Sequence, residues 1–232
     1  MMASRPVFIP KFDPTHLVEE VMVDFTWHPG MAPSQKKKNI AALHESASNM
    51  GLTPLLEVST KSDIQLGQRL SAFSLQLTTP DFSQIYLESA FQGSKVFQDQ
   101  SHYPEIYYLD SLSAKKDPRI KDKKLYCFNF FGDIWPLVPK TAFYDWLYLS
   151  TLRPHKEYLK KLFYFKGFTD IEFNPIKSIN CQARTCALLV SLLHLDLFDY
   201  AMSSKENFIE TVYRDSLRKS HSSDLLQTSF DI

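Results

Sequence analysis

Residues 84–97 read QIYLESAFQGSKVF, and this stretch decides how the middle of the chain folds. A short apolar run meets Glu88, and the pattern predicts a strand that turns into a helix over residues 88–98. In such a helix Glu88, Gln92 and Lys95 share one face, because they stand at positions i, i+4 and i+7. The stretch therefore aligns an acid, an amide and an amine.

Two interpretations of this polar face are open. Charged residues mostly lie on protein surfaces, and Lys95 has a possible partner in Asp99 at i+4, so the pattern alone favours a solvated surface. The other interpretation is one wall of a binding pocket, and the residues of this helix alone do not decide between the two.

Length and composition limit the classes of protein to consider. The chain has 232 residues, enough for one domain with a substantial core, and its formal net charge is zero. Zero net charge argues against a protein that coats nucleic acid by bulk electrostatics, although it allows a local basic patch. With six glycines and no GxGxxG or GxxxxGK[ST] pattern, a glycine-rich phosphate loop is not expected.

The cysteines and the apolar segments indicate a cytoplasmic protein. The three cysteines lie at positions 127, 181 and 186 without a CxxC pair, which favours reduced thiols over disulfides or zinc. The first residues contain no signal-peptide core, and the most apolar segment, 186–198, is too short to span a bilayer. The seven histidines are scattered without metal-ligand spacing, so we expect no metal site.

Periodicity predicts an α+β fold that is predominantly helical, with a few short strands. Strands are expected at 21–27, 54–59 and 72–79. Helices are expected at 33–50, 63–69, 88–98, 139–152, 156–165, 182–195 and 203–220, with helical turns at 103–109 and 113–116 and a loop over 167–180. Ser34 is the expected cap of the first helix, Gly51 its C′ residue, and Ser203 or Ser204 the cap of the last helix.

Three other features have both a structural and a functional interpretation. The loop 167–180 holds polar turn formers, and a long loop before a buried helix is also a common place for function. Trp135 is by default a core residue, although its neighbouring prolines suggest an exposed corner where it stacks on a base. The basic stretches 36–38 and 115–124 are by default solvated, and the alternative is phosphate contact.

The order of several motifs along the chain resembles that of the NADAR family. The motifs are LSAF (70–73), LESAFQGSKVF (87–97), an aspartate at 170 and an asparagine at 180. Further segments are similar to the branch of this family that accompanies DarT-type toxins: RPVFIPKF (5–12), QKKKNIAALH (35–44), LEVSTKS (56–62), WPLVPKTAFYDWLY (135–148) and TDIEFNPIKSINCQA (169–183). The resemblance covers residues 5–210.

The resemblance implies a fold and an activity. It implies one NADAR-type domain over 1–232, with a core at 54–200, a strand–helix extension at 1–53 and a C-terminal helix at 203–220. The implied activity is hydrolysis of the N-glycosidic bond that joins ADP-ribose to the guanine amino group in DNA, which reverses the action of a DarT-type toxin. The modified guanine would be single-stranded or flipped out of the duplex, and no cofactor is implied.

The resemblance also implies the site residues. The catalytic set is Glu88, Lys95 and Asp170, and the substrate-binding set is Lys61, Ser71, Phe73, Gln92, Trp135, Lys140 and Asn180. Within these sets, Asp170 and Asn180 would hold ribose hydroxyls, and Trp135 or Phe73 would stack on a base.

The catalytic roles stay open at this level. A carboxylate, Glu88 or Asp170, would stabilise an oxocarbenium-like transition state or activate water. Lys95 would protonate the leaving amine, or its own amine would attack the opened sugar to give a Schiff base. Two other functions also stay open: an antitoxin that binds its toxin without catalysis, and a glycosidase that acts on small nucleotide metabolites.

Overall fold

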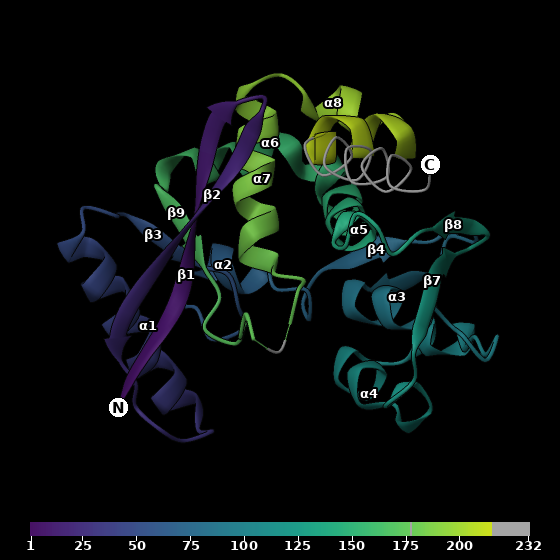
Figure 1. Cartoon of the computed structure of the whole chain (residues 1–232), viewed down its shortest axis with the longest axis horizontal. Coiled ribbons are helices and arrows are strands. Elements are labelled where there is room, and N and C mark those ends of the chain that lie inside the picture. Colours follow the sequence, from purple (N-terminus) through teal and green to yellow (C-terminus); the bar gives the residue numbers. More distant parts are fainter. Residues whose placement is uncertain (177, 215–232) are drawn as a thin grey trace, which may run out of the picture.

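The structure is a computed structural model that describes residues 1–176 and 178–214 (Figure 1). The strands are β1 (Met2–Asp13), β2 (His16–Thr26), β3 (Leu55–Glu57), β4 (Gln76–Thr78), β5 (Gln84–Tyr86), β6 (Lys95–Phe97), β7 (Leu125–Phe130), β8 (Asp133–Trp135) and β9 (Gly167–Thr169). The helices are α1 (Pro33–Asn49), α2 (Gln65–Arg69), α3 (Leu87–Gly93), α4 (Ser111–Lys116), α5 (Ala142–Leu152), α6 (Lys156–Leu159), α7 (Gln182–His194) and α8 (Phe198–Ala201). Short 3₁₀ helices lie at Pro104–Tyr108, Pro118–Ile120, Arg153–His155 and Lys160–Tyr164, and residues 205–214 are helical.

The fold is α+β, as predicted, but the first two strands are long. β1 and β2 span 12 and 11 residues and pair as an antiparallel hairpin, where the sequence predicted a single strand over 21–27. The sequence pattern did not predict β1 because this strand contains Pro6 and Pro10, and proline cannot donate to a strand ladder. Both prolines are tolerated because β1 pairs with β9 only at Phe8, which leaves them at an edge.

β9 lies inside the segment that the sequence predicted to be a loop. The order of the main sheet is β2-β1-β9-β3, with β9 antiparallel to β1 and parallel to β3. The strand approaches its neighbours closely because Gly167 has no side chain; a Cβ there would lie 3.0 Å from Val7 and 3.1 Å from Leu55. β9 fixes the start of the 170–180 segment, which becomes one wall of the site.

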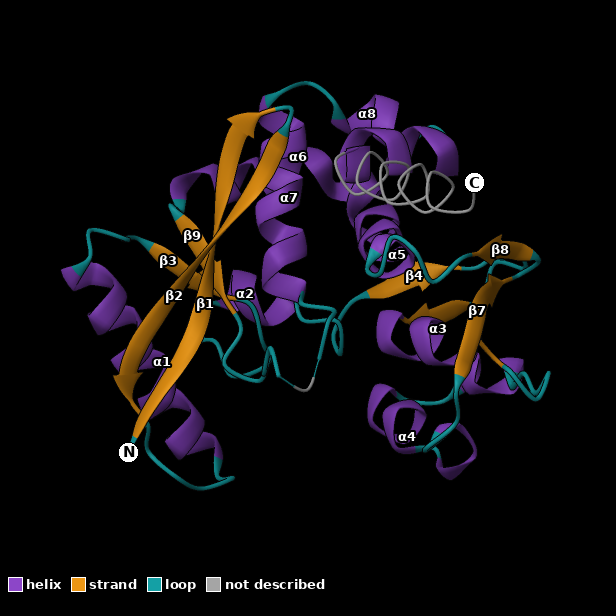
Figure 2. Cartoon of the chain, viewed as in Figure 1, coloured by secondary structure: helices purple, strands orange, loops and turns teal. Residues whose placement is uncertain are grey.

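Helix α1 packs on the β1–β2 hairpin at one side of the molecule (Figure 2). Its first residue is Pro33. Gly51, at φ +74°, is its C′ residue, as the sequence predicted. The predicted Ser34 cap is wrong, because the capping residue is Ala32 and no side chain caps the helix. At the last helix Ser204 is the cap, and its Oγ accepts the N–H of Asn207 at 3.0 Å; residues 215–220 of that predicted helix lie outside the described residues.

The second half of the molecule holds the β4–β5 hairpin, helix α3 and the sheet β6-β7-β8. The predicted helix over 88–98 is too long, because α3 ends at Gly93 and the chain then pairs with β7 as strand β6. Gly93 is required at this bend, since a Cβ would lie 2.4 Å from the ring of Tyr107. Lys95 is therefore a strand residue that follows the helix.

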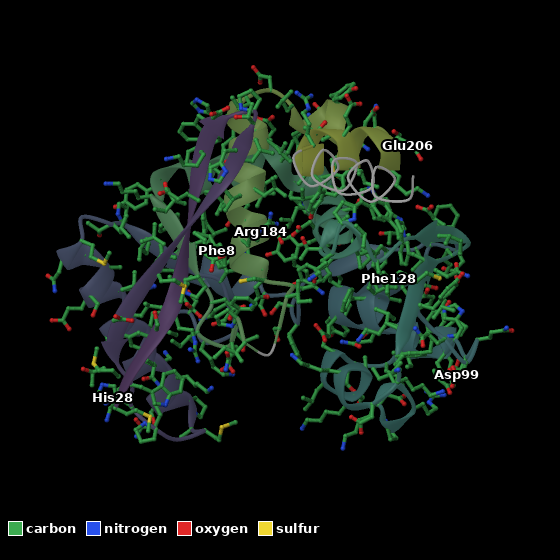
Figure 3. The ribbon with its side chains drawn as sticks, in the orientation of Figure 1. Phe8, His28, Asp99, Phe128, Arg184 and Glu206 are labelled. Atoms are coloured by element: carbon green, nitrogen blue, oxygen red, sulfur yellow. The ribbon has the colours of Figure 1, made fainter. Side chains whose placement is uncertain are left out.

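Helix α7 joins the two halves. It contacts β1 and β2 on one side and α5 on the other, and it is buried along nearly its whole length (Figure 1). Phe8 on β1 and Phe128 on β7 belong to the same continuous hydrophobic core, although they lie in different halves (Figure 3). This shared core holds the two walls of the site at a fixed separation.

Candidate active site

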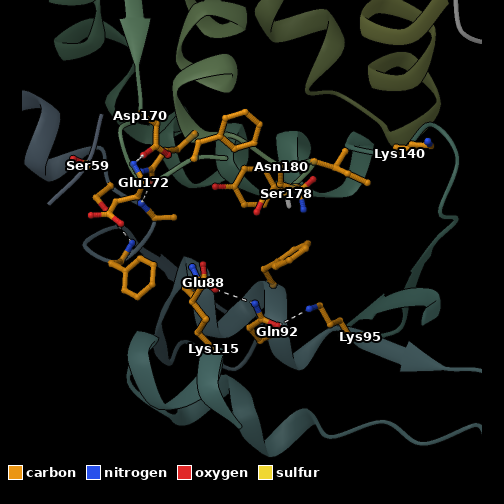
Figure 4. Close-up of a pocket in the computed structure, with 18 of the residues that line it drawn as sticks. Ser59, Glu88, Gln92, Lys95, Lys115, Lys140, Asp170, Glu172, Ser178 and Asn180 are labelled. Atoms are coloured by element: carbon orange, nitrogen blue, oxygen red, sulfur yellow. Dashed lines mark hydrogen bonds between the residues drawn. The ribbon is translucent and has the colours of Figure 1, made fainter. Parts of the chain in front are cut away.

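A cavity of about 990 Å³ opens between helices α3 and α4 on one side and the 170–182 segment on the other (Figure 4). Nine of the ten site residues predicted from the resemblance line it: Lys61, Ser71, Phe73, Glu88, Gln92, Lys95, Lys140, Asp170 and Asn180. These residues come from positions far apart in the sequence, and the fold brings them together around one cavity.

The α3 wall is a hydrogen-bonded chain of three side chains (Figure 4). The amide of Gln92 donates to Glu88 Oε1 at 2.9 Å, and Lys95 Nζ donates to Gln92 Oε1 at 2.6 Å. Glu88 and Gln92 are each 7% exposed. The solvated-surface interpretation is therefore wrong, and Asp99 pairs with Lys123 rather than with Lys95.

The fold fixes this wall from behind. The backbone N–H groups at the start of α3 donate to the 72–75 segment, Leu87 to Leu75 and Glu88 to Ala72. Every residue of α3 is buried, so the helix cannot rotate its polar face away from the cavity.

Lys95 lies in an environment that disfavours its charge. Burial lowers the pKa of Lys95; the carboxylate of Glu88 opposes this shift and the ammonium of Lys115 adds to it. Its Nζ has no carboxylate within 4 Å among the described residues, and the ring of Phe91, with its centroid 5.2 Å from Nζ, is the weaker opposing influence that favours the ammonium form. Such a lysine is suited to act in its neutral form.

The opposite wall begins with Asp170, directly after β9. Its side chain is almost fully buried, and its Oδ1 accepts the N–H of Glu172 at 3.0 Å. Burial raises the pKa of Asp170 to about 8, and the nearby carboxylate of Glu57 adds to the rise. Burial and the charge of Glu57 thus favour the protonated form of Asp170, which suits this residue to donate a proton.

Among the residues that the structure describes, Asn180 has a polar side-chain atom without a partner. Its Oδ1 is buried, and no other described residue donates a hydrogen bond to it. A buried acceptor that is left unpaired costs free energy, so the arrangement favours a ligand that brings a donor, such as a hydroxyl group.

Lysines give the cavity a positive charge that the net charge of the chain conceals. Lys61, Lys115 and Lys140 line it together with Lys95, and in the described part of the chain none of the four has a carboxylate within 4 Å. Lys115 Nζ lies 5.0 Å from the ring centroid of Phe73. The cavity can therefore receive an anion beside an aromatic ring.

Sequence reasoning missed several lining residues. Among them are Ser59, Lys115, Tyr144, Glu172 and Ser178. Lys115 stood in a flagged basic stretch, but the sequence carried no signal that this lysine alone turns towards the cavity. Four other cations of the two basic stretches form ion pairs: Lys36 with Glu172, Lys37 with Asp63, Arg119 with Asp117 and Lys123 with Asp99.

Trp135 does not line the cavity, so its predicted place among the substrate-binding residues is wrong. It is fully buried, its Nε1 donates to Asp133 Oδ2 at 2.9 Å, and its ring packs 5.0 Å from that of Trp146. It therefore presents no face to a ligand. Its neighbours Leu137 and Val138 do line the cavity, so the proline-flanked corner lies at the site while its tryptophan points into the core.

The cysteines offer no activated nucleophile. All three are free, Cys181 and Cys186 are buried, and burial raises the pKa of Cys186 to about 12. Along residues 1–176 and 178–214, no helix combines the length and apolar character that crossing a bilayer requires.

Comparison with known proteins identifies the family. A search of curated proteins found no match. The sequence model of the DarT1-associated NADAR antitoxins matches residues 3–222, nearly the whole chain. The protein therefore belongs to the NADAR family, in the group of DarT1-associated antitoxins.

Proposed function

We propose that the protein is a hydrolase that removes ADP-ribose from the amino group of guanine in DNA, and that it thereby counteracts a DarT-type toxin. The observation that carries this proposal is the pairing of two walls across one cavity: Glu88, Gln92 and Lys95 on one side, and Asp170 and Asn180 on the other. The family of antitoxins to which the chain belongs supports the biological role.

The proposed reaction needs one group that stabilises positive charge and one that gives a proton. Water attacks C1″ of the ribose, a C1″–O bond forms, and the C1″–N bond breaks with its electron pair passing to the guanine nitrogen. Glu88 stabilises the oxocarbenium-like transition state and accepts the proton of the water. Asp170 protonates the leaving nitrogen, because its raised pKa keeps it protonated at neutral pH.

Lys95 offers a second route over the same residues. In its neutral form the amine attacks C1″ of the ring-opened sugar, the guanine amine leaves with a proton, and water hydrolyses the resulting imine. The lowered pKa of Lys95 supports this route, as does its lack of a carboxylate partner within 4 Å in the described part of the chain. Borohydride reduction of the imine distinguishes it from direct hydrolysis.

The size and lining of the cavity suit the substrate. A volume of about 990 Å³ accommodates a nucleotide-sized ligand. In this proposal Lys61, Lys115 and Lys140, which line the cavity, contact the phosphate groups. Asn180 Oδ1 accepts a hydrogen bond from a ribose hydroxyl, and Phe73 stacks on a base. A guanine in a duplex would have to leave the stack to enter, so we expect a single-stranded or flipped-out base.

The test is mass spectrometry of a guanine-ADP-ribosylated oligonucleotide incubated with the protein, with and without borohydride. Wild type should release ADP-ribose and restore the oligonucleotide, Glu88→Gln should not, and the exposed control Glu157→Gln should behave as wild type. A trapped adduct that is absent in Lys95→Ala would establish the imine route. An oligonucleotide that wild type leaves intact would contradict the proposal.

Two further assays separate the alternatives. If the protein neutralises its toxin by binding alone, Glu88→Gln would still rescue cells that express the toxin. If small metabolites are the substrates, kcat/KM on an ADP-ribosylated guanosine would exceed that on the oligonucleotide.

A further inference from the structure

A second buried carboxylate lies behind Asp170 and does not line the cavity. Glu57, on β3, is 2% exposed. Its Oε1 accepts the N–H of Ile171 at 2.9 Å, and its Oε2 accepts the hydroxyl of Thr169 at 2.7 Å. Glu57 therefore holds the residues on both sides of Asp170.

We propose that Glu57 is a positioning residue, whose carboxylate fixes the backbone around Asp170 and whose negative charge adds to the effect of burial in favouring the protonated Asp170 carboxyl. This inference rests on the proposed function, because it assigns Asp170 the role of proton donor. It adds a residue outside the cavity that influences the protonation state of a residue inside it.

The hydrogen bonds indicate which of the two carboxyls carries the charge. Two acids buried together share one proton more readily than they both ionise. Burial raises the pKa of Glu57 as well, but Glu57 accepts a backbone N–H at 2.9 Å and a hydroxyl at 2.7 Å, whereas Asp170 accepts the N–H of Glu172 at 3.0 Å. Donors stabilise the ionised form, so the charge belongs on Glu57 and the proton on Asp170.

The other groups that face the pair do not reverse this assignment. From α1, His44 Nε2 lies 2.8 Å from Thr169 Oγ1, and burial lowers the pKa of His44 to about 4, so it is neutral. From α5 and the start of α7, burial raises the pKa values of these neutral groups above their ordinary range: Tyr144, Tyr148, Cys181 and Cys186. Glu172 pairs with Lys36 at 3.2 Å, which offsets its charge.

Neighbouring bonds tie this clamp to the catalytic cavity. Val58 N–H donates to the Thr169 carbonyl at 2.7 Å, and Gln182 Nε2 donates to the Val58 carbonyl at 2.6 Å. The same Gln182 side chain accepts the N–H of Ala72 at 2.8 Å, next to the start of α3. Thr169, which donates to Glu57, is thus connected through Val58 and Gln182 to the segment before α3.

The experiment compares Glu57→Gln with Thr169→Val. Glu57→Gln keeps the size of the side chain and removes the charge, so the alkaline limb of the kcat/KM profile should move to lower pH by about one unit or more. Thr169→Val removes one bond of the clamp and keeps the charge, so its limb should stay closer to that of wild type. A Glu57→Gln variant that loses activity equally at every pH, with an unmoved limb, would overturn the inference.

A second readout does not depend on activity. In protein labelled with ¹³C at the aspartate carboxyls, the NMR signal of Asp170 is identified by its absence in Asp170→Asn. The midpoint of its titration should move to lower pH in Glu57→Gln. If wild type releases no ADP-ribose, the proposed function fails, but this titration still tests the coupling between Glu57 and Asp170. A titration midpoint of Asp170 that is the same in wild type and Glu57→Gln refutes this coupling, whatever the activity. If Glu57→Gln does not fold, Glu57→Asp replaces it: it retains the charge, so a titration of Asp170 in the ordinary range there would contradict the inference.

Discussion

The ammonium of Lys95 and the carboxylate of Glu88 are joined through an amide and not by a direct ion pair. Gln92 accepts from Lys95 at 2.6 Å and donates to Glu88 at 2.9 Å. The amide fixes both groups in a buried wall and gives Lys95 no counter-charge. A direct ion pair would stabilise the ammonium form and oppose a neutral lysine.

Changing Gln92 to glutamate tests this arrangement. Gln92→Glu gives Lys95 a carboxylate partner and places a second anion beside Glu88, so the pKa of Lys95 should rise. We expect kcat/KM on the modified oligonucleotide to fall about 100-fold, together with any borohydride-trapped adduct. The matched control is Gln98→Glu, outside the cavity; equal effects of the two changes would contradict the role of Gln92.

The raised pKa of Asp170 predicts how stability depends on pH. The pKa of Asp170 is about 8 in the folded protein and 3.8 as its ordinary value. Between these values the folded state binds the proton and the unfolded state does not, so the stabilisation is present at low pH and lost as pH rises towards 8. Asp170→Asn should therefore flatten this decline and raise the free energy of unfolding at pH 8 by on the order of 2 kcal/mol.

Denaturant unfolding of wild type and Asp170→Asn between pH 4 and pH 9 checks this expectation. Asp81→Asn is the control, since Asp81 is an exposed acid whose pKa is lowered by its hydrogen bond with Thr79. If the difference in free energy of unfolding between Asp170→Asn and wild type does not grow as pH rises through this window, Asp170 is ionised in the folded protein.

The motifs predicted the members of the site better than they predicted its geometry. The helical spacing correctly placed Glu88 and Gln92 on one face. It did not place Lys95, because the helix ends at Gly93 and a strand brings the lysine back to Gln92. Lys95 Nζ still donates to Gln92 Oε1, because the lysine side chain is long.

The elements that were missed depend on contacts distant in sequence. β1 contains two prolines, and it is a strand because it pairs with β2 along its length and with β9 only at Phe8. The burial of Trp135 depends on Trp146 and on residues of the last helix, none of which a local pattern reveals. Periodicity reports the faces of single elements, and such packing partners are set by the tertiary fold.

The buried Oδ1 of Asn180, which has no hydrogen-bond partner among the described residues, leads to an unusual expectation for a half-buried residue. Asn180→Ala removes an acceptor that makes no hydrogen bond within the described protein, so the melting temperature should change little. The substrate should lose one hydrogen bond, and KM should rise by up to about 10-fold. Steady-state kinetics and thermal unfolding measure both; a large loss of stability with an unchanged KM would mean that Asn180 has a purely structural role.

Adjacent lysines on α4 provide a matched pair for the charge of the cavity. Lys115 lines the cavity and lies over Phe73, whereas Lys116 is exposed and does not line it. Lys115→Met should lower kcat/KM and reduce the slope of log kcat/KM against log salt by about 0.7, the value for one phosphate contact to a single strand. Lys116→Met should leave both unchanged. If the two variants lose activity and salt dependence equally, the phosphate is attracted by the whole basic stretch and not bound by Lys115 in the cavity.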